Sequence, residues 1–285
     1  MPQTAKNRLF QFLKALLIAA GVYVFYFVMQ ILVNTVAING IALWYRASGL
    51  NGDDYVTQVE AVFNQYFSVV YIACVALTIL LIVIAFRIFQ KPFPAAVRLQ
   101  KLDFEIAVLA FIVGIFLNVA ISAANAMIPY PQEWIDANNE SVSSFSAGNV
   151  WINLFATCIA APVVEEILYR GLIYNILKRA SSAIPAAIVS SVMFGIFHGN
   201  PLQALYAGTA ALLLVYVYER SGSLIGSILA HAGFNSSYLF TGGLYESLSG
   251  LSLLFVALLI LTGITILFTL RSRLLRRHGA DDCDT

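Results

Sequence analysis

The stretch Ala161–Gly171, with the sequence APVVEEILYRG, places two adjacent carboxyl groups, a phenol and a guanidinium in an otherwise apolar run from about Val150 to Leu177. A run of that length spans a bilayer, and ionisable side chains at such depth cost roughly 2.5–3.5 kcal/mol each on insertion scales. The chain must recover this free energy by pairing these groups or by using them. The stretch therefore indicates a functional site inside a membrane segment.

The composition is that of a membrane protein. Of the 285 residues 60% are hydrophobic and 11% are charged, and the mean hydropathy is +0.82. Soluble domains carry about 25% charged residues, so we expect a polytopic membrane protein, with no nucleic acid among its partners. Cys74 and Cys158 lie in apolar runs and Cys283 lies in the tail, a distribution that does not indicate a disulfide framework.

The apolar runs predict an all-α fold, a polytopic membrane helix bundle of about eight transmembrane helices. The expected spans are Leu9–Ala37, Val62–Phe89, Phe104–Met127, Val150–Leu177, Ala183–His198, Leu202–Tyr218, Leu224–Phe240 and Leu251–Leu270.

The charges alternate between the two ends of these spans. Bases flank the termini and every second connection: Lys6, Arg8, Lys14, Lys91, Arg98, Lys101, Lys178, Arg179, Arg220, Arg271, Arg273, Arg276 and Arg277. The other connections carry acids, with Arg46 as their only base: Asp53, Asp54, Glu60, Glu133, Asp136, Glu140 and Glu246. Because Lys and Arg favour the cytoplasmic side, we predict a multi-pass integral membrane protein with both termini cytoplasmic. The C-terminal bases can also contact anionic membrane lipid.

The fifth expected span, Ala183–His198, is short. Its 16 residues give roughly 24 Å of helix, against a bilayer core of about 30 Å. Asn200 offers a side-chain cap and Pro201 suits the first position of the next helix. We therefore expect the turn Gly199–Pro201 to lie below the outer surface, next to a cavity.

The adjacent acids in the opening stretch have different partners on a helix. Successive side chains diverge by about 100°, so Glu165 and Glu166 face different ways. Glu166 and Arg170 are four residues apart, the spacing at which an acid and a following base pair best. Glu165 is left with Tyr169 at the same spacing and without a cation, as expected for a carboxyl group that acts as a general base.

Two of the three histidines lie in expected spans. Phe194 precedes His198 by one helical turn and is expected to pack against its ring. His231 and Asn235 share one helical face. An imidazole can move a proton or bind a metal, and a neighbouring amide can donate to an oxyanion.

These residues form three motifs in order on successive apolar segments: Glu165-Glu166-x-x-x-Arg170, Phe194-x-x-x-His198 and His231-x-x-x-Asn235. The ordered triple resembles the CPBP intramembrane proteases, the family of the type II CAAX prenyl endopeptidases and of the bacteriocin-processing and immunity proteins. The resemblance divides the chain into N-terminal transmembrane helices with an outer loop (1–149), CPBP-like catalytic helices (150–240), and a last helix with a basic cytoplasmic tail (241–285).

The resemblance implies hydrolysis of a peptide bond, in a peptide or lipidated-peptide substrate, near the membrane surface. Glu165 would activate a water that His198 positions, and His231 and Asn235 would stabilise the oxyanion. The residues implied to support this site are Glu166, Tyr169, Arg170 and Phe194. The cofactor is either none or one zinc ion, whose ligands would be Glu165 or Glu166 with His198 and His231.

Other classes of protein remain open from the residues alone. A proton-coupled transporter could use the same Glu, Arg and His side chains as an ion path, although the chain lacks the internal repeat that many carriers show. An immunity protein could keep the fold without turnover, although all three motifs are intact here.

Overall fold

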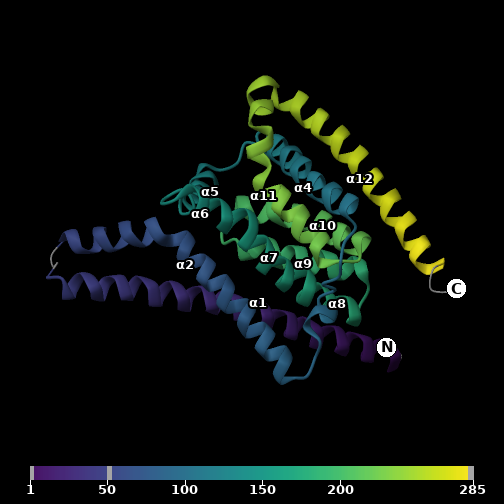
Figure 1. Ribbon diagram of the computed structural model, residues 1–285, viewed down its shortest axis with the longest axis horizontal. Helices are drawn as coiled ribbons and strands as arrows, with labels where there is room; N and C mark the ends of the chain where they lie inside the picture. Colours follow the sequence, from purple (N-terminus) through teal and green to yellow (C-terminus); the bar gives the residue numbers. More distant parts are fainter. Residues whose placement is uncertain (1–2, 50–52, 282–285) are drawn as a thin grey trace.

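The computed structural model describes residues 3–49 and 53–281, and this part of the chain consists of helices joined by short connections, without strands (Figure 1). The predicted all-α class is confirmed. The elements are α1 Gln3–Ala47, α2 Asp53–Ile88, α3 Phe93–Ala96, α4 Phe104–Asn125, α5 Gln132–Ser143, α6 Val150–Phe155, η1 Ala156–Ala160, α7 Ala161–Glu166, η2 Ile167–Tyr174, α8 Asn175–Ala180, α9 Ala183–Phe197, α10 Pro201–Ser221, α11 Leu224–Ser247 and α12 Gly250–Asp281. Cys283 lies outside the described residues, as do the side chains of Asp53, Asp54, Glu246, Lys6, Arg276 and Arg277.

Each expected span corresponds to a helix or to a continuous run of helical segments. Within the described residues, six of these are long and apolar enough to cross a membrane, and α9 is a shorter apolar helix of 15 residues. The helix α11 is long but carries His231, Asn235 and several hydroxyl groups, which lower its hydropathy. The chain is therefore an integral membrane protein.

The first two helices are much longer than predicted. Helix α1 contains 45 residues and α2 contains 36, and together they form a hairpin that extends beyond the bundle (Figure 1). The predicted bounds Leu9–Ala37 and Val62–Phe89 were wrong because they followed hydropathy. No proline interrupts the polar flanks, so the helices continue until Gly49, whose φ of +85° ends α1.

The central membrane helix is not a regular α-helix. Two π-helical segments, η1 and η2, flank α7, in which Pro162 stands near the start. Proline lacks an N–H group and its ring collides with the preceding turn, so a wider turn before it relieves the clash. The expected span Val150–Leu177 is therefore one continuous helical run that contains two wider segments.

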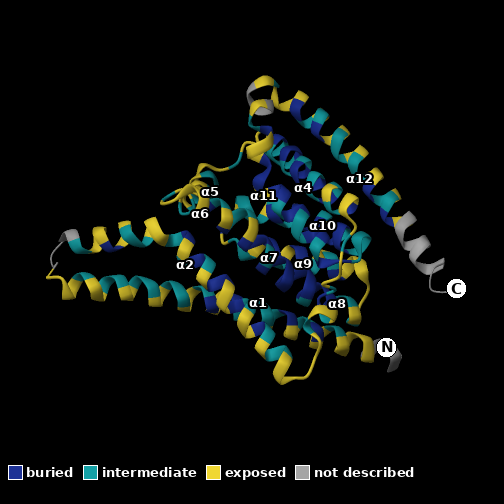
Figure 2. Ribbon diagram, in the orientation of Figure 1, coloured by how far each residue is buried: buried dark blue, intermediate teal, exposed yellow. Residues whose placement is uncertain are grey.

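Close helix packing fixes the position of α11 against α4. A side chain at Gly114 would overlap the Ala230 carbonyl, and one at Gly233 would overlap the Phe111 carbonyl. The buried residues concentrate where α7, η2, α9, α10 and α11 meet, whereas the α1–α2 hairpin and α12 are largely exposed (Figure 2). This contact sets the register of the residues that follow Ala230, among them His231.

Candidate functional site

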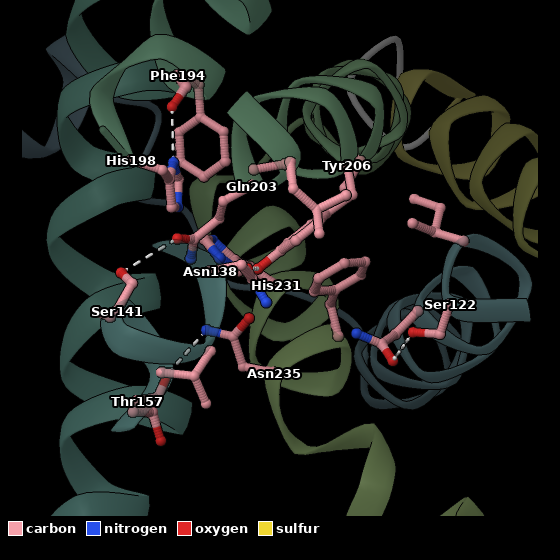
Figure 3. Close-up of a pocket in the computed structure, with 18 of the residues that line it drawn as sticks. Ser122, Asn138, Ser141, Thr157, Phe194, His198, Gln203, Tyr206, His231 and Asn235 are labelled. Atoms are coloured by element: carbon pink, nitrogen blue, oxygen red, sulfur yellow. Dashed lines mark hydrogen bonds between the residues drawn. The ribbon is translucent and has the colours of Figure 1, made fainter. Parts of the chain in front are cut away.

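A cavity of about 740 Å³ lies between the helices of the bundle (Figure 3). Glu165 from α7, His198 after α9, and His231 and Asn235 from α11 all line it, together with Phe194. The four residues predicted to act together are thus brought to one cavity, although they come from helices separated along the chain.

The Glu165 carboxyl group faces this cavity and has few polar contacts with other side chains. Its Oε2 lies 3.7 Å from His231 Nε2, too far for a hydrogen bond. Within the described chain it makes no hydrogen bond, and the side chain is nevertheless largely buried. A carboxylate in this setting is available to a water or a substrate in the cavity.

Glu166 lies behind the cavity wall in a paired environment. Arg170 Nη1 donates to its Oε1 at 2.7 Å, so the ion pair predicted from the spacing is confirmed. Both side chains are almost fully buried, at 0% and 1% exposure. Arg170 also donates to the Ala211 carbonyl and stacks over the Phe194 ring. The charge of each group is compensated inside the protein.

The same Glu166 oxygen also accepts a hydrogen bond from His231, a contact that was not predicted from the sequence. His231 Nδ1 lies 2.9 Å from Glu166 Oε1, and a carboxylate only accepts, so Nδ1 carries the proton. This bond directs Nε2 of the ring toward Glu165 and the cavity. Glu166 is therefore a positioning residue for His231 in addition to the partner of Arg170.

His198 is oriented by the turn that precedes it. Its Nδ1 donates to the Phe194 carbonyl at 2.9 Å, and Phe194 packs edge-on against the ring, as predicted. Nε2 is then the unprotonated nitrogen of the neutral ring and can accept a hydrogen bond. Tyr169 packs edge-on against Phe194 and does not line the cavity.

The turn after His198 has the predicted caps. Asn200 accepts from the Gln203 backbone N–H, and Pro201 is the first residue of α10. Asn200 is buried and its neighbours Leu202 and Gln203 line the cavity, whereas Gly199 and Pro201 are exposed, so the turn lies next to the cavity without being enclosed.

Asn235 is held by a carbonyl that Pro162 leaves free. In η1 the Ala161 N–H donates to the Ala156 carbonyl, five residues back. In the same register the Thr157 carbonyl would pair with residue 162, but proline has no N–H. Asn235 Nδ2 donates to this carbonyl at 2.8 Å (Figure 3). One N–H of the amide remains for a ligand.

The rest of the cavity wall was missed from the sequence. Uncharged polar side chains from four other helices, α2, α4, α5 and α10, contribute: Tyr71, Asn118, Ser122, Asn125, Asn138, Ser141, Gln203 and Tyr206. Asn118, Ser122 and Asn125 stand four and three residues apart in an apolar segment, which places them on one helical face. That spacing was the available signal.

The possible zinc ligands do not fit a metal as they lie. Over residues 3–49 and 53–281, no group of three His, Cys, Asp or Glu side chains is arranged to hold a metal ion. His231 Nδ1 is bonded to Glu166, and Glu166 Oε1 is already shared with Arg170. We therefore derive no step through a metal.

The comparison with known families follows the same segments. The pattern of the type II CAAX prenyl endopeptidase Rce1-like family matches residues 147–237, which contain all three motifs. The predicted resemblance to the CPBP family is confirmed over these residues. The match includes α6 to α10 and the first half of α11, the elements that carry or precede Glu165, His198, His231 and Asn235.

Two curated proteins show partial similarity to this chain. "Putative membrane peptidase YdiL" from Bacillus subtilis is 24% identical over 139 residues, which are 48% of this chain and 57% of that protein. "X-ray radiation resistance-associated protein 1" from Mus musculus is 36% identical over 62 residues, which are 22% of this chain and 8% of that protein. The chain thus matches little more than half the length of the first relative. No solved structure matches it significantly.

Proposed function

We propose that this protein is an intramembrane endopeptidase that hydrolyses a peptide bond by means of a water activated by Glu165. One observation carries the proposal: of two adjacent buried carboxyl groups, Glu166 is occupied by Arg170 and His231, whereas Glu165 is open to the cavity. A buried carboxylate that makes no hydrogen bond to a described residue and faces a cavity is suited to accept a proton.

The first step forms the nucleophile. Glu165 takes one proton from the water, and the oxygen of the water forms a bond to the carbonyl carbon of the scissile peptide. The π electrons of the carbonyl move to its oxygen and give a tetrahedral oxyanion. His198 Nε2 accepts a hydrogen bond from the same water and fixes its orientation.

The second step requires donors for the oxyanion. Asn235 supplies the N–H that its bond to Thr157 leaves free. His231 supplies Nε2–H in its imidazolium form, which the Glu166 carboxylate stabilises through Nδ1. Glu165 then returns its proton to the leaving amine while the C–N bond breaks. The products are a carboxylic acid and an amine.

The substrate in this proposal is a peptide that reaches the cavity from the membrane or its surface, as the resemblance to the CAAX prenyl endopeptidases implies. The resemblance also includes lipidated peptides, and the apolar exterior of the bundle would allow an attached lipid to remain in the bilayer.

The experiment is a cleavage assay with purified protein and a peptide library that contains lipidated and unlipidated members. Glu165→Gln keeps the shape of the side chain and removes the base, so we expect turnover to fall by about 10²–10⁴-fold. The matched control is Glu105→Gln, which removes an exposed acid at the far end of α4. Retained turnover in Glu165→Gln, with an unchanged elution profile in size-exclusion chromatography, would remove Glu165 from this role.

A further inference from the structure

The cavity extends toward one end of the bundle. Its outer lining comes from the last turn of α4, from α5 and from the first turn of α10, at Asn125, Asn138, Ser141 and Gln203. Both chain termini and the α8–α9 connection lie at the opposite end (Figure 1). No described residue of that opposite end lines the cavity.

A buried layer separates the cavity from the end that holds the termini. Glu166 and Arg170 follow Glu165 along the chain toward α8 and are buried. The Phe194 ring covers the Arg170 guanidinium, with its centroid 4.8 Å from Cζ. Tyr174 and Leu177 continue this packing toward the α8–α9 connection, and both are fully buried. A peptide at the terminal end therefore has no open path to Glu165.

The charges assign the two ends to the two sides of the membrane. The described bases at the terminal end, from helix ends and connections, are Arg8, Arg87, Lys91, Arg98, Lys101, Lys178, Arg179, Arg220, Arg271 and Arg273. The cavity end carries Arg46 and the acids of α5, Glu133, Asp136 and Glu140. Under the positive-inside rule the terminal end is cytoplasmic, and the cavity mouth is extracytoplasmic.

The lining also restricts the chemistry of the ligand. None of the residues around the cavity is Lys or Arg, so a free C-terminal carboxylate would find no permanent cation there, only the imidazoles of His198 and His231. The amides of Asn118, Asn125 and Asn138 each donate and accept hydrogen bonds. Such groups match the alternating N–H and C=O groups of an extended peptide backbone.

From these observations we infer that the cavity takes an internal segment of an extended peptide from the extracytoplasmic side, rather than the free C-terminal tail of a cytoplasmic protein. The inference rests on the proposed function for the cleavage itself. The side of access rests on geometry and charge alone.

A labelling experiment tests the side of access without using activity. In a background of Cys74→Ala, Cys158→Ala and Cys283→Ala, Asn138→Cys reports the cavity mouth and Ser182→Cys reports the terminal end. A membrane-impermeant maleimide is added to spheroplasts that express each variant. We expect Asn138→Cys to react in intact spheroplasts and Ser182→Cys to react only after lysis. The reverse pattern, or equal reaction of both, would overturn the inference.

A second arm tests the internal segment. Two peptides share one sequence around the scissile bond. One ends in a free carboxylate three residues after the bond, and the other continues as a longer chain. We expect kcat/KM to be at least about tenfold higher for the longer peptide, because the carboxylate of the shorter one lacks a cation partner. Equal rates or preference for the short peptide would contradict this inference and leave the proposed protease intact. Cleavage of neither would defeat the proposed function, and the labelling would still decide the side.

Discussion

Glu165 and Glu166 are neighbours in the sequence but belong to two different regions of the molecule. Glu166 lies in the core behind the cavity, where Arg170 and His231 share one of its oxygens. Glu165 lies on the cavity wall, where His231 Nε2 is 3.7 Å from its Oε2. The roughly 100° between successive helical side chains is enough to send one carboxyl group into each region.

The comparison shows that two identical carboxyl groups take different roles because the side chains around them differ. A buried arginine compensates the charge of the Glu166 carboxylate, so this group stays ionised and fixed in position. It can therefore orient the neighbouring His231 ring. A carboxylate that faces an open cavity keeps its lone pairs for a ligand. The following variants test this contrast.

Removal of the core charge should have the largest effect on folding. Glu166→Gln leaves Arg170 buried without its partner, and such a loss typically costs about 3–5 kcal/mol. We expect a lower free energy of unfolding and a lower folded yield, measured by denaturant titration in detergent. By contrast, Glu165→Gln should leave both quantities nearly unchanged.

The control for this variant removes both charges. In Glu166→Gln/Arg170→Met no buried charge remains unpaired, so the double variant should recover part of the lost stability. A stable and well-folded Glu166→Gln that has lost activity would mean that the roles assigned to the two acids must be exchanged.

Asn235→Ala should lower kcat strongly and change the free energy of unfolding only slightly. Loss of one oxyanion donor lowers kcat by about 10²–10³-fold in other hydrolases. Asn235 is exposed to the cavity, so its removal should change the free energy of unfolding by only about 1 kcal/mol, the value of its bond to Thr157.

The comparison variant is Asn118→Ala, which shortens another amide of the same wall. We expect it to raise KM more than it lowers kcat, because it would contact the substrate away from the reacting carbonyl. An equal fall in kcat in both variants would argue against an oxyanion role for Asn235.

Pro162→Ala tests how the backbone prepares the cavity wall. The new N–H can pair with the Thr157 carbonyl and compete with the Asn235 amide. We expect kcat to fall by about tenfold, while stability stays level or rises because alanine favours the helix. Unchanged turnover would mean that Asn235 keeps its orientation without this carbonyl.

The smallest effect should follow a change at the terminal end. Glu219 binds both Arg98 and Lys178 in a partly exposed ion-pair network. Such pairs contribute about 0.2–1 kcal/mol each, and salt screens them. We expect Glu219→Gln to lower the free energy of unfolding slightly at low salt, with no difference at high salt and no change in turnover. A large loss of activity would connect this end to the cavity.

The sequence predicted features that depend on neighbours along the chain. The Glu166–Arg170 pair, the packing of Phe194 on His198 and the cap at Asn200 each join residues three or four positions apart, a distance that helix geometry fixes. Apolar run length likewise located the helices. It misplaced the ends of α1 and α2, because hydropathy marks the membrane and does not end a helix.

The sequence by itself thus determined an all-helical membrane protein, its three motifs and the divergence of its two adjacent acids. Only the tertiary structure decided what each acid meets. The Glu166–His231 and Asn235–Thr157 bonds join residues 65 and 78 positions apart, and the amides of α4 and α5 reach the cavity only through helix packing. The physical reason is that helical periodicity fixes the direction of a side chain relative to its own helix. Close packing, such as that of Gly114 against Ala230, selects the helix that it faces.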